Sequence, residues 1–175
     1  MTKTTKLVYM SLLISQALVL SKIESLIPVP FLMPGAKLGL ANIVTMIAIY
    51  TLGYKKAFTV LSIRILLSVF FAGSMSKLMY SLGGASFSFI FIIIFMIIFK
   101  ENISIIGISI VGAVFHNIGQ ILVAILILES SAVIFYMPIL ILIAIPTGIF
   151  IGFCSKYILL YLKKLNLAKY INWQG

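Results

Sequence analysis

Long apolar runs constrain this chain more than any other feature of its sequence. Six stretches are nearly free of charge, and each approaches or exceeds the roughly 17 to 25 residues that a helix needs to cross a bilayer. They cover approximately residues 7–23, 38–52, 57–73, 82–99, 103–128 and 132–156. Hydrophobic residues make up 63% of the 175 positions, whereas soluble domains are about half apolar. We therefore predict an all-α membrane protein, one integral membrane domain over residues 1–175 with six transmembrane helices.

The basic residues indicate how these helices are oriented. Cytoplasmic loops of membrane proteins carry an excess of Lys and Arg. With the N-terminus in the cytoplasm, nine lysines fall on the inner side and three on the outer side, which predicts that both termini are cytoplasmic. The net charge of +10 is then a topology signal, and no nucleic-acid partner is expected. The inner lysines are Lys3, Lys6, Lys55, Lys56, Lys100, Lys156, Lys163, Lys164 and Lys169, and the outer ones are Lys22, Lys37 and Lys77.

A proline-rich stretch separates the first two runs. Pro28, Pro30 and Pro34 interrupt any helix between Glu24 and Asn42, because proline removes a helical hydrogen bond and clashes with the preceding turn. The predicted topology places this stretch outside the membrane. We interpret it as the rim and partial lid of an outward-facing pocket.

Polar side chains at membrane depth predict what that pocket contains. Arg64 lies eight residues beyond Lys56, about 12 Å into the bilayer at the helical rise, where an arginine must point into the bundle. His116 and Gln120 are four residues apart and share one face of the fifth helix. We predict that a small polar or anionic ligand binds in the outer half of the bundle. The predicted substrate-binding residues are Glu24, Lys37, Asn42, Arg64, His116, Asn117 and Gln120.

Two alternatives to a ligand site stay open at this point. The amide and imidazole groups of the fifth helix can serve as hydrogen bonds between helices, each worth about 1 kcal/mol or less. Arg64 can pair with Glu24 without any ligand.

Gly83 and Gly84 allow close approach of a backbone, and we interpret this as packing of a neighbouring helix.

Small residues recur every four positions along the first run. This spacing lets a second helix approach closely, and we predict a partner interface there, either within the chain or with another subunit. Its residues are Ser11, Ser15, Ala17 and Ser21.

The sequence lacks the residues that several enzyme classes require. It contains no aspartate and three isolated glutamates, whereas prenyl-diphosphate synthesis needs paired carboxylates to hold magnesium. It has no glycine-rich ATP-binding loop and no Cys/His cluster for a metal, and Cys154 is interpreted as a packed helix residue. We therefore expect no catalysis by this chain alone, no metal and no cofactor.

Several motifs together resemble one family. They are ESLIPVP at 24–30, PGAKLGLAN at 34–42, RILL at 64–67, YSLGG at 80–84 and GAVFHNIGQ at 112–120. The chain resembles the Gx transporter family, also labelled heptaprenyl diphosphate synthase component I, which is similar to the substrate-binding (S) components of energy-coupling factor (ECF) transporters.

The resemblance implies a six-helix subunit in the cell membrane of a bacterium that captures a small molecule from outside. It also implies a transmembrane T subunit and cytoplasmic ATPases as partners, with small residues of the first helix contacting the T subunit. The family label implies an alternative, a non-transporting membrane subunit or scaffold linked to isoprenoid or quinone metabolism or to flavin-based extracellular electron transfer.

Overall fold

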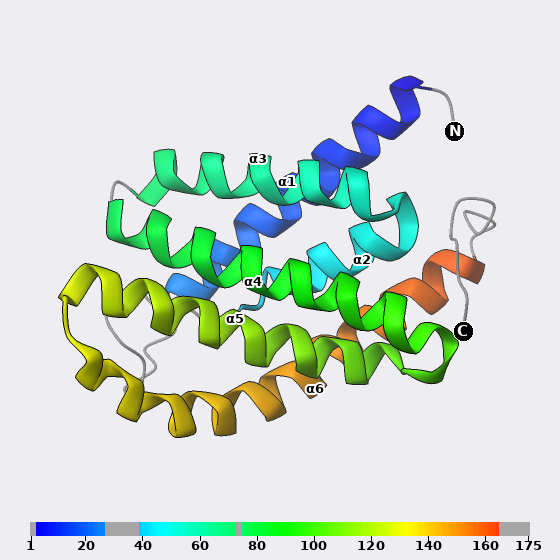
Figure 1. The fold of residues 1–175 in the computed structure, drawn as a ribbon. Helices are drawn as coiled ribbons and strands as arrows, with labels where there is room; N and C mark the ends of the chain where they lie inside the picture. Colours follow the sequence, from blue (N-terminus) through cyan, green and yellow to red (C-terminus); the bar gives the residue numbers. More distant parts are fainter. Residues whose placement is uncertain (1–2, 27–38, 73–74, 165–175) are drawn as a thin grey trace.

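A computed structural model describes residues 3–26, 39–72 and 75–164 of the chain. Over these residues the fold consists of six α-helices and two short 3-10 helices, with no β-strand, as Figure 1 shows. The prediction of an all-α protein is confirmed. The helices are α1 (Lys3–Leu26), α2 (Asn42–Leu52), α3 (Tyr54–Ala72), α4 (Met75–Phe99), η1 (Lys100–Asn102), α5 (Ile105–Leu128), η2 (Ser131–Tyr136) and α6 (Met137–Lys164).

Four stretches of the described chain are long and apolar enough to cross a membrane. They are Lys3–Leu26, Leu78–Phe99, Ile105–Leu128 and Ser131–Lys164. The helix α3 has 19 residues, but it carries Lys55, Lys56 and Arg64 and does not belong to this group. The structure therefore confirms a membrane protein, while six complete spans stay a prediction.

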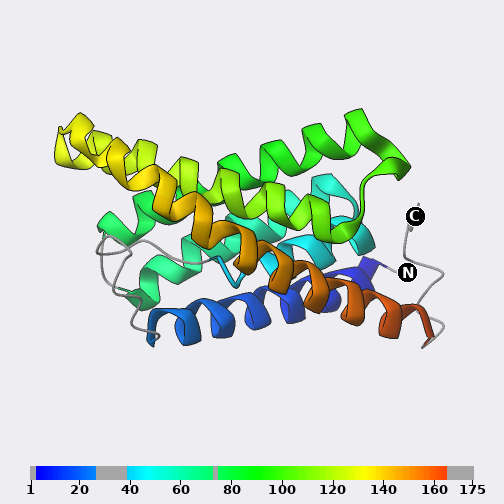
Figure 2. The same ribbon diagram turned by 90° about the horizontal axis from the view of Figure 1, so that it is seen from below.

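The second predicted span is shorter than its apolar run indicates. The helix α2 begins only at Asn42 and has 11 residues, about 16 Å of helix, or half of the hydrocarbon thickness. It is nevertheless the most enclosed helix, because nine of its eleven residues are buried. It packs against α1, α3 and α6 in the interior of the bundle (Figure 2). Backbone that is not helical at membrane depth is tolerated where protein covers it. Two hydrogen bonds close the turn that leads into α2. The backbone N–H of Asn42 donates to the Gly39 carbonyl (2.8 Å), and that of Ile43 donates to the Leu40 carbonyl (3.0 Å).

Glycines bring α4, α5 and α6 into backbone contact. A Cβ on Gly83 of α4 would lie 2.8 Å from the carbonyl oxygen of Gly119 on α5. A Cβ on Gly148 or Gly152 of α6 would lie 2.6 Å from Cα of Ile110 or 2.7 Å from Cα of Ile106, respectively. These positions have no room for a side chain, so glycine determines how closely the three helices approach. The predicted packing role of Gly83 is confirmed.

The two ends of the bundle carry different connections. The start of α1 and the end of α6 lie at one end, together with the α2–α3 turn and η1 (Figure 1). The end of α1, the end of α3 and the α5–α6 connection lie at the opposite end. The start of α1 and the end of α6 therefore lie on the same side of the bundle.

Candidate functional site

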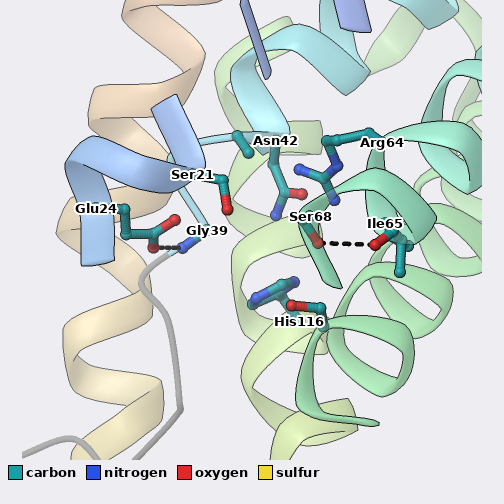
Figure 3. Close-up of a pocket in the computed structure, with 10 residues that line it drawn as sticks. Ser21, Glu24, Gly39, Asn42, Arg64, Ile65, Ser68 and His116 are labelled. Atoms are coloured by element: carbon teal, nitrogen blue, oxygen red, sulfur yellow. Dashed lines mark hydrogen bonds between the residues drawn. The ribbon is translucent and has the colours of Figure 1, made fainter. Parts of the chain in front are cut away.

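A small cavity lies where α1 ends and α2 begins. It is also lined by the second half of α3, by α4 and by the middle of α5, so residues far apart in the sequence meet there (Figure 3). Its volume of about 20 Å³ has room for one ordered water, and a larger ligand requires the lining helices to move apart. The lining residues are Ser21, Glu24, Gly39, Ala41, Asn42, Arg64, Ile65, Ser68, Ser81 and His116.

The α1 side of the cavity is formed by Ser21 and Glu24. These residues are three positions apart and both belong to the buried face of α1, as helical periodicity requires. One carboxylate oxygen of Glu24 accepts a hydrogen bond from the backbone N–H of Gly39. Gly39 has a φ of +90°, a conformation that side chains disfavour. The Glu24 carboxylate thus holds the chain just before α2 against the end of α1.

Arg64 supplies the positive charge of the site. Its side chain is only 7% exposed, and the charge of Glu24 acts favourably on its guanidinium. One turn further along α3, the Ser68 hydroxyl donates to the carbonyl of Ile65 (2.8 Å). A guanidinium has five N–H donors and no acceptor, so Arg64 favours carboxylates and other oxygen acceptors in its surroundings.

His116 and Gln120 form the α5 side. Nε2 of His116 lies 3.0 Å from the amide nitrogen of Gln120, and both residues are buried. The imidazole packs on Gly84 of α4, where an added Cβ would lie 2.8 Å from Cε1 of His116. The ring is therefore held between α4 and its own helix, where it lines the cavity.

Asn42 is the first residue of α2 and projects into the cavity. Its side chain is 4% exposed, and within the described residues its amide nitrogen has no hydrogen-bond partner. Figure 3 shows the Asn42 amide and the Arg64 guanidinium directed into the same space. An unsatisfied buried donor costs about 1 to 3 kcal/mol, so this amide is a ready hydrogen-bond donor for a bound molecule.

The predicted binding residues divide into three groups. Glu24, Asn42, Arg64 and His116 line the cavity together. Gln120 does not line it but contacts His116. The remaining two differ, because Asn117 turns toward α6 and donates to the carbonyl of Leu140 (2.8 Å), whereas Lys37 lies outside the described residues.

The four small residues of α1 lie on different faces of the helix. Ser11 and Ser15 are exposed, and each hydroxyl donates to the carbonyl four residues earlier. Ala17 and Ser21 are buried inside this chain, and Ser21 lines the cavity. A partner helix can therefore reach the first pair directly, while the chain's own helices cover the second pair.

The sequence analysis did not assign several of the lining residues to a binding site. Ser21 shares a helix face with Glu24, and Ser68 follows Arg64 by four positions, so helical spacing was a usable signal for both. Ser81 and Gly39 had no such signal, because their place depends on how α4 and the start of α2 pack. Among the described residues no group of three or more His, Cys, Asp or Glu side chains is placed to hold a metal ion.

Comparison with known proteins adds one finding. A family model described as heptaprenyl diphosphate synthase component I matches residues 13–158, a range that includes every residue lining the cavity. No curated protein and no solved structure matches the chain.

Proposed function

The chain belongs to the heptaprenyl diphosphate synthase component I family, and from the geometry of its cavity we propose that it is the substrate-binding (S) component of an ECF-type transporter. It captures a small polar or anionic metabolite from outside the cell. Six helices cross the membrane in this proposal, with both termini in the cytoplasm. The end of the bundle that contains the cavity then faces outward.

One observation carries this proposal. A buried arginine shares one cavity with a histidine, a glutamate and a buried amide donor that has no partner among residues 3–26, 39–72 and 75–164. Helix packing alone does not account for this arrangement, because an unsatisfied donor and a charge in an apolar bundle both cost free energy. Bound ligand oxygens supply an acceptor for the Asn42 amide and further acceptors for the Arg64 guanidinium.

The energy for release is proposed to come from other subunits. The chain has no aspartate and no ATP-binding loop, so we propose that it is not an enzyme and that a T subunit and cytoplasmic ATPases drive transport. The exposed Ser11 and Ser15 on α1 are suited to a close helix contact with the T subunit.

The test is to purify the protein from its native membrane and identify what accompanies it. We expect native mass spectrometry to detect a bound small molecule, and we expect the T subunit and the ATPases to co-purify. Arg64→Ala is expected to lose the small molecule, measured on the folded fraction of the variant. A matched control is Lys164→Ala, because Lys164 is exposed at the far end of α6 and its loss leaves the cavity unchanged. A folded Arg64→Ala variant that retains the small molecule would contradict the proposal.

The family description favours a second candidate, a membrane subunit or scaffold that serves prenyl-diphosphate synthesis or an electron-transfer complex. The same purification separates the two. A synthase subunit, a reductase or a flavin-bearing protein in place of the ATPases, with no small molecule in the cavity, supports the scaffold and overturns the transporter.

A further inference from the structure

Two lysines lie beside each other where α1 and α3 begin, at the end of the bundle away from the cavity. Lys6 is on the face of α1 that carries the buried Leu13, and Lys56 is on the face of α3 that carries the buried Val60 and Arg64. Both lysines are half-buried. They therefore belong to the packed faces of their helices and not to the outer faces.

The chain holds α1 and α3 together at this point. The Tyr9 hydroxyl, one turn after Lys6, donates to Oγ1 of Thr51 in the last turn of α2 (3.3 Å). The turn at Gly53 then brings the start of α3 back against α1. Desolvation and the positive charge of the neighbouring Lys6 lower the pKa of Lys56. The two ammonium groups thus repel each other across the α1–α3 interface.

Among the residues that the structure describes, no glutamate is placed to offset this repulsion. Glu24 lines the cavity, and Glu129 follows α5 at the opposite end of the bundle. Glu101 belongs to η1, which lies on the far side of the bundle from the start of α1 (Figures 1 and 2). The sequence contains no other acidic residue. The pair of lysines is therefore suited to an anion from outside the chain.

The surroundings of the two lysines narrow the choice of anion. Apolar side chains lie directly beside them in the sequence, with Leu7 and Val8 on α1 and Phe58 on α3 each more than half exposed. In a membrane, exposed apolar side chains of this kind contact acyl chains. A phospholipid offers both a phosphate for the ammonium groups and acyl chains for these side chains, whereas an anion free in solution offers only the first.

We propose that Lys6 and Lys56 form a binding site for the phosphate group of an anionic phospholipid at the start of the α1–α3 interface. The headgroup lies between the two ammonium groups, and the acyl chains cover Leu7, Val8 and Phe58. The bound phosphate offsets the repulsion and so strengthens the contact between α1 and α3. The site is remote from the cavity, so this inference does not depend on the transporter role.

Two other lysines provide a matched control. Lys3 and Lys55 belong to the same two helices at the same end of the bundle, but both are exposed. The double variants Lys6→Gln/Lys56→Gln and Lys3→Gln/Lys55→Gln therefore remove equal charge from one surface, and only the first removes the pair within the interface. A difference between them reports a site and not the general attraction of basic residues for anionic lipid.

The experiment measures thermal unfolding of the full-length protein, purified and freed of lipid in a neutral detergent. Phosphatidylglycerol is the anionic probe, phosphatidylcholine with the same acyl chains is the zwitterionic reference, and glycerol 3-phosphate supplies a phosphate without acyl chains. A ligand that binds only the folded state raises Tm with its concentration. At ten times its Kd, phosphatidylglycerol is expected to raise the Tm of the wild type by about 4 °C. The other two probes are expected to give no shift at the same concentration.

The variants are expected to respond differently. Lys6→Gln/Lys56→Gln should bind phosphatidylglycerol about tenfold more weakly and lose most of the shift, whereas Lys3→Gln/Lys55→Gln should keep it. Without lipid, the single variant Lys56→Gln is expected to unfold at a higher temperature than the wild type, because the repulsion is gone. Phosphatidylglycerol is expected to reverse this order.

Three results would overturn the proposal. If phosphatidylcholine stabilises the wild type as well as phosphatidylglycerol does, or if both double variants lose the shift equally, the two lysines do not form an anion site. If glycerol 3-phosphate gives the same shift as phosphatidylglycerol, the ligand is a free phosphate and the lipid assignment is wrong. If Lys56→Gln is no more stable than the wild type without lipid, the repulsion on which the site rests is absent.

Discussion

Nε2 of His116 lies 3.0 Å from the amide nitrogen of Gln120, one helical turn further along α5. Because an amide nitrogen only donates, Nε2 accepts, and the neutral imidazole carries its proton on Nδ1. Gln120 therefore selects the tautomer of the ring that faces the cavity, although it does not line the cavity itself.

This relationship predicts that Gln120→Met weakens ligand retention. Methionine fills a similar volume but cannot donate, so the imidazole loses the group that orients it. A lost hydrogen bond of about 1 kcal/mol corresponds to roughly fivefold weaker binding. Native mass spectrometry of the purified variant measures the retained small molecule. Gln16→Met is the control, because Gln16 is exposed on α1; equal retention by both variants would disprove the role of Gln120.

The effects on stability of removing the Glu24 charge and the Arg64 charge are expected not to be additive. Arg64→Met removes the positive charge on which the buried Glu24 carboxylate acts favourably, and a buried charge left uncompensated costs about 3 to 5 kcal/mol. The double variant Glu24→Gln/Arg64→Met removes both charges and is expected to recover at least 1 kcal/mol of that loss. Thermal unfolding of the four proteins in detergent gives this coupling energy.

Glu129→Gln is the control for the charge experiment, since Glu129 is exposed at the end of α5 and is expected to have no effect on stability. Strictly additive effects of the Glu24 and Arg64 substitutions would show that the two charges do not interact in the folded protein.

Asn117 and Asn42 are expected to have different roles, Asn117 in stability and Asn42 in ligand binding. Asn117→Leu removes a buried hydrogen bond of 2.8 Å to the Leu140 carbonyl and should lower stability by about 1 to 2 kcal/mol with ligand binding unchanged. Asn42→Leu removes a donor that has no partner within the described part of the chain, so it should abolish binding at little cost in stability. Unfolding and ligand retention measured on both variants test this, and a binding defect in Asn117→Leu would reverse the assignment.

The α4–α5 contact is expected to tolerate no side chain at Gly119. A Cβ there would lie 2.8 Å from the carbonyl carbon of Gly83 and 2.9 Å from Cβ of Phe87. Gly119→Ala should therefore destabilise the protein by about 1 to 3 kcal/mol through overpacking. Gly107→Ala on the same helix meets side-chain atoms and no backbone, with Cγ1 of Ile103 at 3.1 Å and Oγ of Ser104 at 3.5 Å, and should be nearly neutral. If thermal unfolding finds the two variants equally stable, the backbone contact between α4 and α5 does not exclude a side chain at Gly119.

The orientation in the membrane can be measured with single cysteines. Cys154 is the one cysteine of the chain, so Cys154→Ser provides a background free of thiols. Ser131→Cys, exposed at the α5–α6 connection, and Lys164→Cys, exposed at the end of α6, lie at opposite ends of the bundle. A maleimide that does not cross membranes should label the first in intact cells and the second only after permeabilisation. Labelling in the opposite order would invert the proposed topology.

The sequence alone was sufficient for everything that depends on short-range periodicity. Long apolar runs require a membrane or an equally apolar environment, and they identified the all-α class. A spacing of four residues puts two side chains on one helix face, and His116 and Gln120 do interact. The burial of Arg64 inside the bundle was predicted from the helical rise and from the cost of exposing a charge to lipid.

Only the tertiary structure decided which faces meet. Asn117 is adjacent to His116 in sequence, yet it turns to α6 and not to the cavity, because successive residues of a helix point about 100° apart. Ser21 had the spacing of an interface residue but lies at the cavity, since α1 turns that face inward. The local sequence determines which residues share a face, whereas close packing of α4, α5 and α6 through their glycines determines what each face contacts.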